Sequence, residues 1–165
     1  MRRVLFVCTG NIFRSLTAEY ALRHALAGRP GVHVSSAGTV DFPHVVRPNV
    51  RDYLRAKGFD VSLHQRRTLT EAILRESHLV IAMSVDHQAY LRGRFGHAAP
   101  LFLEACGELA AALPDIEEVV HDYQTNGAAV EAHVRATIDR IVSLTPRLAA
   151  RLDSLLDRVY ISGTP

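Results

Sequence analysis

The sequence is poor in cysteine, with only Cys8 and Cys106 among its 165 residues. These two form neither a Cys-x-x-Cys pair nor a disulfide framework, which excludes a cysteine-based zinc site and a disulfide-stapled scaffold. The nine histidines are scattered without the spacing of metal ligands. We therefore expect no metal and no cofactor, and a free thiol that suits the reducing cytoplasm.

The chain also lacks a large excess of charge and any long apolar run. Its formal net charge is +2 and its arginines are mixed with acidic residues, which argues against nucleic acid as a partner. The first apolar run, residues 4–7, ends at a polar loop and is too short for a signal peptide or a membrane span. We expect a cytoplasmic protein without a membrane partner, and the sequence is silent on its oligomeric state.

Short apolar runs alternate with helical patterns along the chain. Three such runs, residues 4–7, 79–83 and 100–103, are typical of buried parallel strands, and residues 32–36 are expected to form a short second strand. An alanine-rich helix to about Leu113 is expected after the fourth strand, and a long last helix that Pro146 kinks or divides. We predict one domain over residues 1–165, of the α/β class: a three-layer sandwich of a four-stranded parallel sheet with helices on both faces.

The loop after the first strand carries the clearest chemical pattern, Cys8-Thr-Gly-Asn-Ile-Phe-Arg14-Ser15. Gly10 and Asn11 can adopt left-handed backbone angles, so the loop can turn its N–H groups toward an anion at the start of the next helix. Arg14 can bind two phosphate oxygens at once. Cys8 lies at the base of this positive loop, which favours the thiolate, and the Ser15 hydroxyl can donate to it.

A buried cysteine that merely ends a strand is the alternative for Cys8. The Cys-x5-Arg spacing between a strand and a helix favours a nucleophile in a phosphate-binding loop instead. The residues expected to bind phosphate are Thr9, Gly10, Asn11, Ile12, Phe13, Arg14 and Ser15.

At this loop the sequence resembles the low-molecular-weight protein tyrosine phosphatases, whose loop usually reads C-x-G-N-x-C-R-S-P. The resemblance continues in the segments Ser36-Ala-Gly-Thr39, Ser62-Leu-His64-Gln-Arg-Arg67 and Leu79-Val-Ile-Ala-Met83, and covers about residues 1 to 145. It implies a cysteine-dependent phosphatase that hydrolyses phosphotyrosine through a phosphocysteine intermediate. The partner would be a phosphotyrosine-containing protein or a small aryl phosphate.

The resemblance also implies roles for residues outside the chemistry itself. Asn11, Ser15, Ser36 and His64 would hold the loop in its conformation. Ile12 stands at a position where, in the family, threonine accompanies a preference for phosphoarginine and isoleucine accompanies a preference for phosphotyrosine. The residues expected to line the substrate site are Ile12, Phe42 and Tyr123, with ordinary loop packing as the alternative for Phe42.

The match is weakest at the general acid, which in the family is an Asp followed by Pro. No Asp-Pro occurs in this chain. Counting back from the last helix favours Asp122, with Tyr123 in place of the proline, and Asp115 is the alternative. Two other functions stay open: a binding relative that has lost turnover, and an arsenate reductase, for which Cys106 alone offers too few further thiols.

Overall fold

The computed structural model describes residues 1–27, 29–41, 43 and 45–162. Along the chain the elements are β1 (Arg2–Cys8), α1 (Arg14–Ala25), β2 (Val32–Gly38), α2 (Pro48–Ala56), α3 (Glu71–Arg75), β3 (Leu79–Ala82), α4 (Val85–Phe95), α5 (Phe102–Ala105), α6 (Ile116–Val119) and α7 (Gly127–Ser162). Strands alternate with helices as the sequence predicts, so the chain has the expected α/β class.

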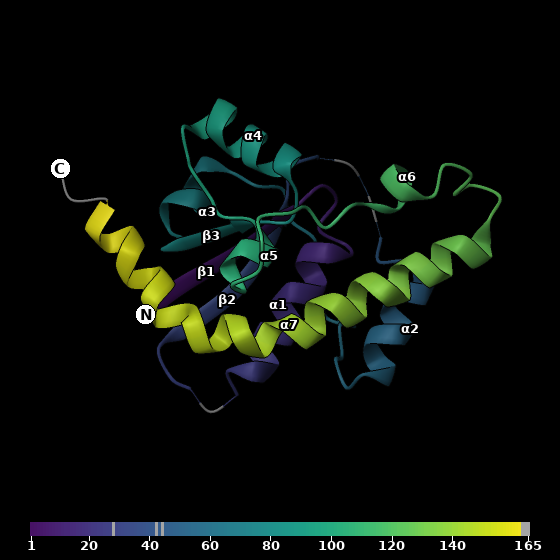
Figure 1. Ribbon diagram of the computed structural model, residues 1–165, viewed down its shortest axis with the longest axis horizontal. Coiled ribbons are helices and arrows are strands. Elements are labelled where there is room, and N and C mark those ends of the chain that lie inside the picture. Colours follow the sequence, from purple (N-terminus) through teal and green to yellow (C-terminus); the bar gives the residue numbers. More distant parts are fainter. Residues whose placement is uncertain (28, 42, 44, 163–165) are drawn as a thin grey trace.

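The sheet is parallel, and β1 is its central strand. The strand order is β2-β1-β3, with Val4 of β1 opposite Val34 of β2 and Leu79 of β3. Alternate residues of β1 face opposite sides of the sheet. Phe6 packs with α1, α5 and α7 on one side, and Val7 packs with α3 and α4 on the other (Figure 1). Helices on both faces explain why β1 is an uninterrupted apolar run.

The predicted fourth strand is wrong. In the described part of the chain the sheet has three strands, and residues 100–103 contribute only an isolated bridge between Leu101 and Ala82. Pro100 has no N–H for a ladder, and the Leu101 N–H bonds the Glu104 carboxylate at 3.2 Å, which starts α5 instead. The expected helix to Leu113 is also wrong, because α5 ends at Ala105.

The last helix, α7, is a single helix of 36 residues that contains Pro146, so the proline does not divide it. Figure 1 shows that its yellow C-terminal part runs in a different direction from the rest. The helix packs along α1 and also contacts α2, α5 and α6, and thereby covers one side of the sheet. Among the described residues, no helix is both long enough and apolar enough to cross a membrane.

Candidate active site

The loop from β1 to α1 curls around the sulfur of Cys8. Cys8 is buried, and its Sγ lies 2.9 Å from the Ser15 hydroxyl and 3.3 Å from the Asn11 backbone N–H. Asn11 is the one non-glycine residue with a positive φ, +57°, in the part of the chain that the structure describes. This left-handed turn directs the Asn11 N–H at the sulfur, where it stabilises a thiolate.

Gly38, at the end of β2, lies directly against this loop. A Cβ built on Gly38 would lie 2.6 Å from the Thr9 carbonyl oxygen and 3.2 Å from the Asn11 backbone nitrogen. Both neighbours are backbone atoms, so neither can rotate out of the way. The glycine of the Ser-Ala-Gly-Thr segment is therefore what allows the loop to approach β2.

Arg14 lies under the loop with only 1% of its surface exposed. Its Nη1 donates to the Leu113 carbonyl oxygen at 2.9 Å and its Nη2 donates to the Thr9 hydroxyl at 3.3 Å. Nη2 also forms an ion pair with the Asp115 carboxylate. A guanidinium held in this way can exchange the Asp115 carboxylate for the oxygens of a bound phosphate.

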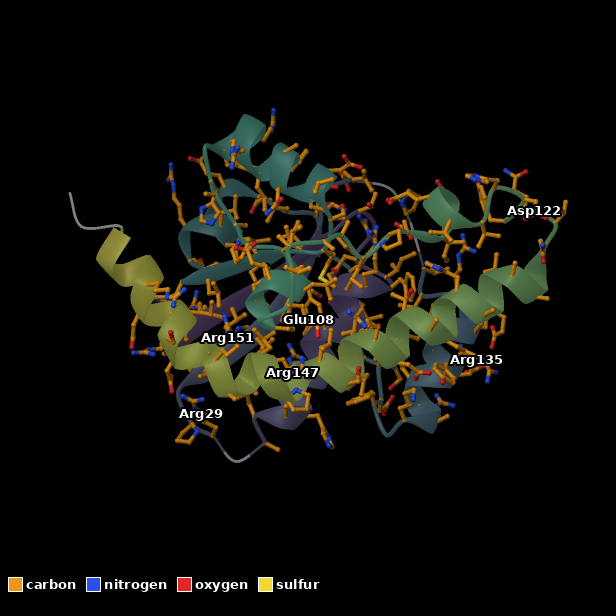
Figure 2. The ribbon with its side chains drawn as sticks, viewed as in Figure 1. Arg29, Glu108, Asp122, Arg135, Arg147 and Arg151 are labelled. Carbon is orange, nitrogen blue, oxygen red and sulfur yellow. The ribbon has the colours of Figure 1, made fainter. Side chains whose placement is uncertain are left out.

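The structure brings Asp115, and not Asp122, to the loop. Asp115 caps α6, and its Oδ1 accepts the Ile116 backbone N–H at 2.9 Å, which leaves Oδ2 for Arg14. Asp122 is exposed, bonds the Asn126 side chain at 2.9 Å, and lies near the start of α7 at the far end of the molecule (Figure 2).

Counting back from the last helix favours Asp122, but this count does not allow for an extra element that lies between Asp115 and that helix. The four-residue helix α6 and a turn separate Asp115 from α7. Tyr123, the residue expected beside the acid, is partly buried and packs with the apolar cluster of α1, α2, α6 and α7. Phe42 falls outside the described residues.

A cavity of about 580 Å³ opens at Cys8. Its polar and charged lining comprises Cys8, Thr9, Gly10, Arg14, Arg47, Asp115 and Glu117. Its apolar lining comprises Ile12, Phe13, Val40, Pro43, Val45, Val50 and Ile116. The cavity therefore combines the loop that surrounds the Cys8 sulfur with apolar walls of the kind that accept an aromatic ring.

The four residues expected to support the loop come together around Asn11. Its side-chain nitrogen donates to the hydroxyls of Ser15 at 3.1 Å and Ser36 at 2.6 Å, and the His64 ring donates to its carbonyl oxygen at 2.8 Å. Its side-chain oxygen accepts the Arg67 backbone N–H at 3.0 Å. Each polar atom of this buried residue thus has a partner, which holds its left-handed conformation.

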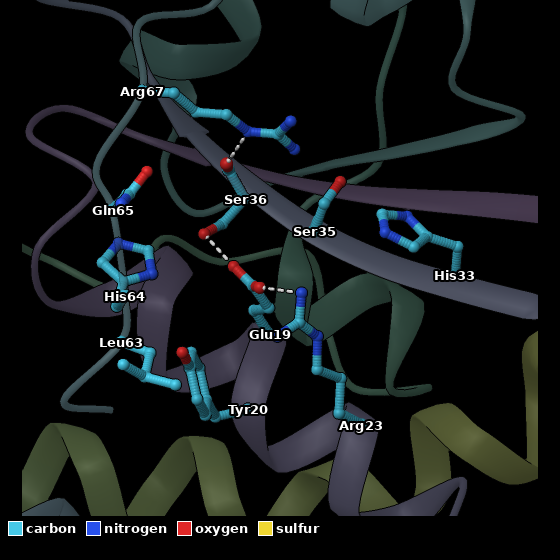
Figure 3. Close-up of a pocket in the computed structure, with 10 residues that line it drawn as sticks. All are labelled: Glu19, Tyr20, Arg23, His33, Ser35, Ser36, Leu63, His64, Gln65 and Arg67. Carbon is cyan, nitrogen blue, oxygen red and sulfur yellow. Dashed lines mark hydrogen bonds and ion pairs between the residues drawn. The ribbon is translucent and has the colours of Figure 1, made fainter. Parts of the chain in front are cut away.

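The sequence did not single out three further residues that contact this machinery. Glu19 is buried, accepts the Ser36 hydroxyl and pairs with Arg23 (Figure 3). Arg66 donates to the carbonyl oxygens of Gly10 at 3.3 Å and Val40 at 2.6 Å. His87, from α4, bonds the Thr9 hydroxyl at 3.0 Å. None has a local signal, because the contacts with Ser36, Gly10 and Thr9 join different segments of the sequence.

Comparisons with known proteins show the family of this chain. The sequence matches the model described as "Low molecular weight phosphotyrosine protein phosphatase" over residues 3–154. It is 32% identical over 95 residues to the probable low molecular weight protein-tyrosine-phosphatase EpsP of Ralstonia solanacearum, covering 57% of this chain and 63% of that protein. It is 36% identical over 96 residues to the protein-arginine-phosphatase of Bacillus subtilis (strain 168), covering 56% of this chain and 63% of that protein.

The chain thus spans just under two thirds of the length of these two curated relatives. The likeness in structure is more complete. The crystal structure of a YwlE mutant from Bacillus subtilis superposes with a TM-score of 0.78 at 25% identity, covering 93% of this chain and 99% of that one. On the match over residues 3–154, the chain belongs to the low-molecular-weight phosphotyrosine protein phosphatase family.

Proposed function

We propose that this protein hydrolyses aryl phosphate monoesters, phosphotyrosine above all, through a phosphocysteine intermediate. The observation that carries the proposal is that Cys8, Arg14 and Asp115 line one cavity. A nucleophile, a bidentate phosphate ligand and a carboxylic acid are the three groups that this reaction needs.

In the first step the Cys8 thiolate attacks phosphorus, the S–P bond forms and the P–O bond to the leaving group breaks. The ion pair between Arg14 and Asp115 breaks, and Arg14 binds two phosphate oxygens instead. The loop N–H groups stabilise the charge that develops on the other phosphate oxygens. Asp115, released from the guanidinium, enters this step in its protonated form. Asp115 donates that proton to the leaving phenolate oxygen.

In the second step Asp115, now a carboxylate, takes a proton from water as the water oxygen attacks the phosphocysteine. The S–P bond breaks, and the Cys8 thiolate is restored as inorganic phosphate forms. The Ser15 hydroxyl and the Asn11 N–H, which contact Sγ, stabilise the thiolate as it leaves.

The apolar walls around the cavity support an aryl ester. Ile12, Val45 and Ile116 line the cavity with Cys8, and their aliphatic side chains are suited to the faces of a phenyl ring. A phosphotyrosine side chain of a protein and a small aryl phosphate present the same ring. We propose the former as the physiological partner and, because a nucleophilic thiol requires reducing surroundings, the cytoplasm as the location.

Cys106 does not support the alternative of arsenate reduction. It lies in the core formed by β1, α5 and α7, and burial raises the pKa of its thiol to about 12. It is also absent from the residues that line the Cys8 cavity. A buried thiol that resists ionisation is a poor partner for disulfide exchange with Cys8.

The test compares hydrolysis of two esters by wild type, Cys8→Ser, Asp115→Asn and Asp122→Asn. Cys8→Ser is expected to abolish turnover, and Asp115→Asn to lower kcat by about 10²–10⁴-fold on phenyl phosphate. The loss should be smaller on p-nitrophenyl phosphate, because nitrophenolate leaves without being protonated. Asp122→Asn serves as the control and should match wild type.

An inert wild-type protein that still binds phosphate would overturn the proposed activity. If Asp115→Asn lost the same factor in kcat on both esters, Cys8 would remain the proposed nucleophile, but Asp115 would not be the general acid. Phosphoarginine, assayed in parallel with phosphotyrosine, decides between the two activities named for the curated relatives, and faster hydrolysis of phosphoarginine would contradict the proposed substrate.

A further inference from the structure

His87 lies behind the phosphate-binding loop and is outside the set of residues that line the cavity. It is 3% exposed, in the first turns of α4. Its Nε2 lies 3.0 Å from the Thr9 hydroxyl and its Nδ1 lies 2.8 Å from the Ser84 hydroxyl. Both ring nitrogens of a buried histidine are therefore committed to hydroxyl partners.

The contact continues from Thr9 to the arginine of the loop. Arg14 Nη2 donates to the Thr9 hydroxyl oxygen at 3.3 Å, and the Thr9 hydroxyl can in turn donate its proton to His87 Nε2. The remaining ring proton, on Nδ1, is then donated to Ser84. With this tautomer, one directed chain of hydrogen bonds runs from the guanidinium through Thr9 and His87 to Ser84.

The charge on His87 matches this arrangement. Burial, with a further contribution from the Arg14 guanidinium, lowers the pKa of His87 to about 4, against a smaller opposite effect of Asp115. The ring is therefore neutral at pH 7 and keeps one bare nitrogen to accept the Thr9 proton. A neutral ring also adds no second positive charge behind the site of a phosphate.

We propose that His87 is a positioning residue for Arg14, which acts through the Thr9 hydroxyl. Leu113 orients one terminal nitrogen of the guanidinium and Thr9 orients the other. When Arg14 releases Asp115 to bind phosphate, these two contacts keep the guanidinium plane aligned with the phosphate oxygens. Because Thr9 is half-exposed at the cavity, His87 supplies the fixed partner that sets the rotamer of its hydroxyl.

This proposal rests on the proposed function only in that the bound group is a phosphate, so its test uses binding as well as turnover. Inorganic phosphate is titrated against the alkylation of Cys8 by iodoacetate, which gives a Kd without catalysis. Thr9→Val removes the hydroxyl at nearly constant shape, and His87→Leu removes the ring. Each is expected to weaken phosphate binding about 10-fold, as expected for the loss of one buried hydrogen bond.

The combination of the two changes separates positioning from general damage. In the double variant the loss should equal that of either single variant, because both remove the same chain of hydrogen bonds. Thr9→Ser keeps the hydroxyl, and His87→Gln keeps one hydrogen-bond donor and one acceptor. These conservative variants should therefore lose less affinity for phosphate than Thr9→Val and His87→Leu. His97→Gln, a partly buried histidine after α4, is the matched control and should bind phosphate as wild type does.

Thermal unfolding of each variant shows whether it is folded. If His87→Leu does not fold, the phosphate Kd values of the remaining variants still test the proposal. Thr9→Val is then compared with Thr9→Ser, and His87→Gln is compared with wild type. Wild-type affinity in Thr9→Val or in a folded His87→Leu would overturn the proposal, and so would losses that multiply in the double variant. A wild-type protein that binds phosphate without hydrolysing esters would overturn the proposed function alone.

Discussion

Arg14 and Asp115 form an ion pair at the cavity that contains Cys8, although they lie 101 positions apart in the sequence. The pair joins a 1% exposed guanidinium to a carboxylate that is 31% exposed. Phosphate must displace this carboxylate to bind Arg14 with two oxygens. The residue that we propose as the general acid is therefore also expected to compete with the substrate for Arg14 before turnover.

Asp115→Asn should for this reason bind inorganic phosphate several-fold more tightly than wild type while its turnover falls. The substitution removes the competing charge and the negative field that opposes a dianion. Protection of Cys8 from iodoacetate gives the phosphate Kd, and phenyl phosphate hydrolysis gives kcat. Glu117→Gln also removes one negative charge from the cavity, but it leaves the ion pair of Arg14 with Asp115 in place. It should therefore change the phosphate Kd and kcat much less. Weaker phosphate binding by Asp115→Asn would contradict the competition.

Gly38→Ala should displace the loop, because its Cβ would meet the Thr9 carbonyl oxygen at 2.6 Å. We expect a loss of about 1–3 kcal/mol in the free energy of unfolding and a matching loss of turnover, since the clash lies beside Cys8. Urea unfolding and p-nitrophenyl phosphate hydrolysis measure the two effects.

Gly93→Ala is the matched control for this change. Gly93 lies within α4, and a Cβ there would meet nothing within 4 Å. Alanine in a helix interior is favoured over glycine by up to about 1 kcal/mol, so this variant should be slightly more stable than wild type with unchanged turnover. If both variants lost stability equally, crowding against the loop would not be the cause.

Ile12→Thr should shift the substrate preference away from phosphotyrosine. The Ile12 side chain is one of the apolar walls beside Cys8, and threonine would replace an ethyl group there by a hydroxyl. The difference in apolar contact is worth about 10-fold or more in kcat/KM for an aryl ester. The ratio of kcat/KM for phosphotyrosine to that for phosphoarginine measures the shift, and an unchanged ratio would show that Ile12 does not select the substrate.

The parts of the site that the sequence predicted are those encoded locally. Cys8 ends the buried strand β1 and Arg14 begins α1, so a loop of five residues determines their spacing. The position of Asp115 beside Arg14 could not be found in this way, because Asp115 and Asp122 are separated by a helix that shows no periodicity over its four residues. Likewise, the contact of His87 with Thr9 depends on how α4 packs beside β1.

The sheet shows the same division between local and tertiary information. The strands at residues 4–7 and 79–83 are apolar and were predicted, whereas the run at 100–103 is equally apolar and forms no strand. The outcome there depends on Pro100, which cannot donate to a ladder, and on the Glu104 carboxylate, which takes the Leu101 N–H. Hydrophobicity predicted the burial of this segment but not its hydrogen bonding.

The last prediction concerns His87 and acid. Its pKa is about 4 in the folded protein and about 6.5 in an unfolded chain, so between these values the unfolded state binds more protons. The stabilisation from the neutral ring is thus complete above about pH 6.5 and is lost as the pH falls toward 4, by on the order of 3 kcal/mol. The charged groups that act on the ring are Arg14, which adds to this shift, and Asp115, which opposes it.

His87→Gln isolates this contribution, because glutamine can keep hydrogen bonds to Thr9 and Ser84 but does not titrate. Wild type should exceed the variant in free energy of unfolding by more at pH 7 than at pH 4.5, and urea unfolding at both pH values measures the two gaps. The same change at His121, an exposed residue before α7, should leave the free energy of unfolding near that of wild type at both pH values. A gap between wild type and His87→Gln that does not change with pH would mean that His87 is not held neutral by burial, and the hydrogen bond from Thr9 to its bare nitrogen would then lose its basis.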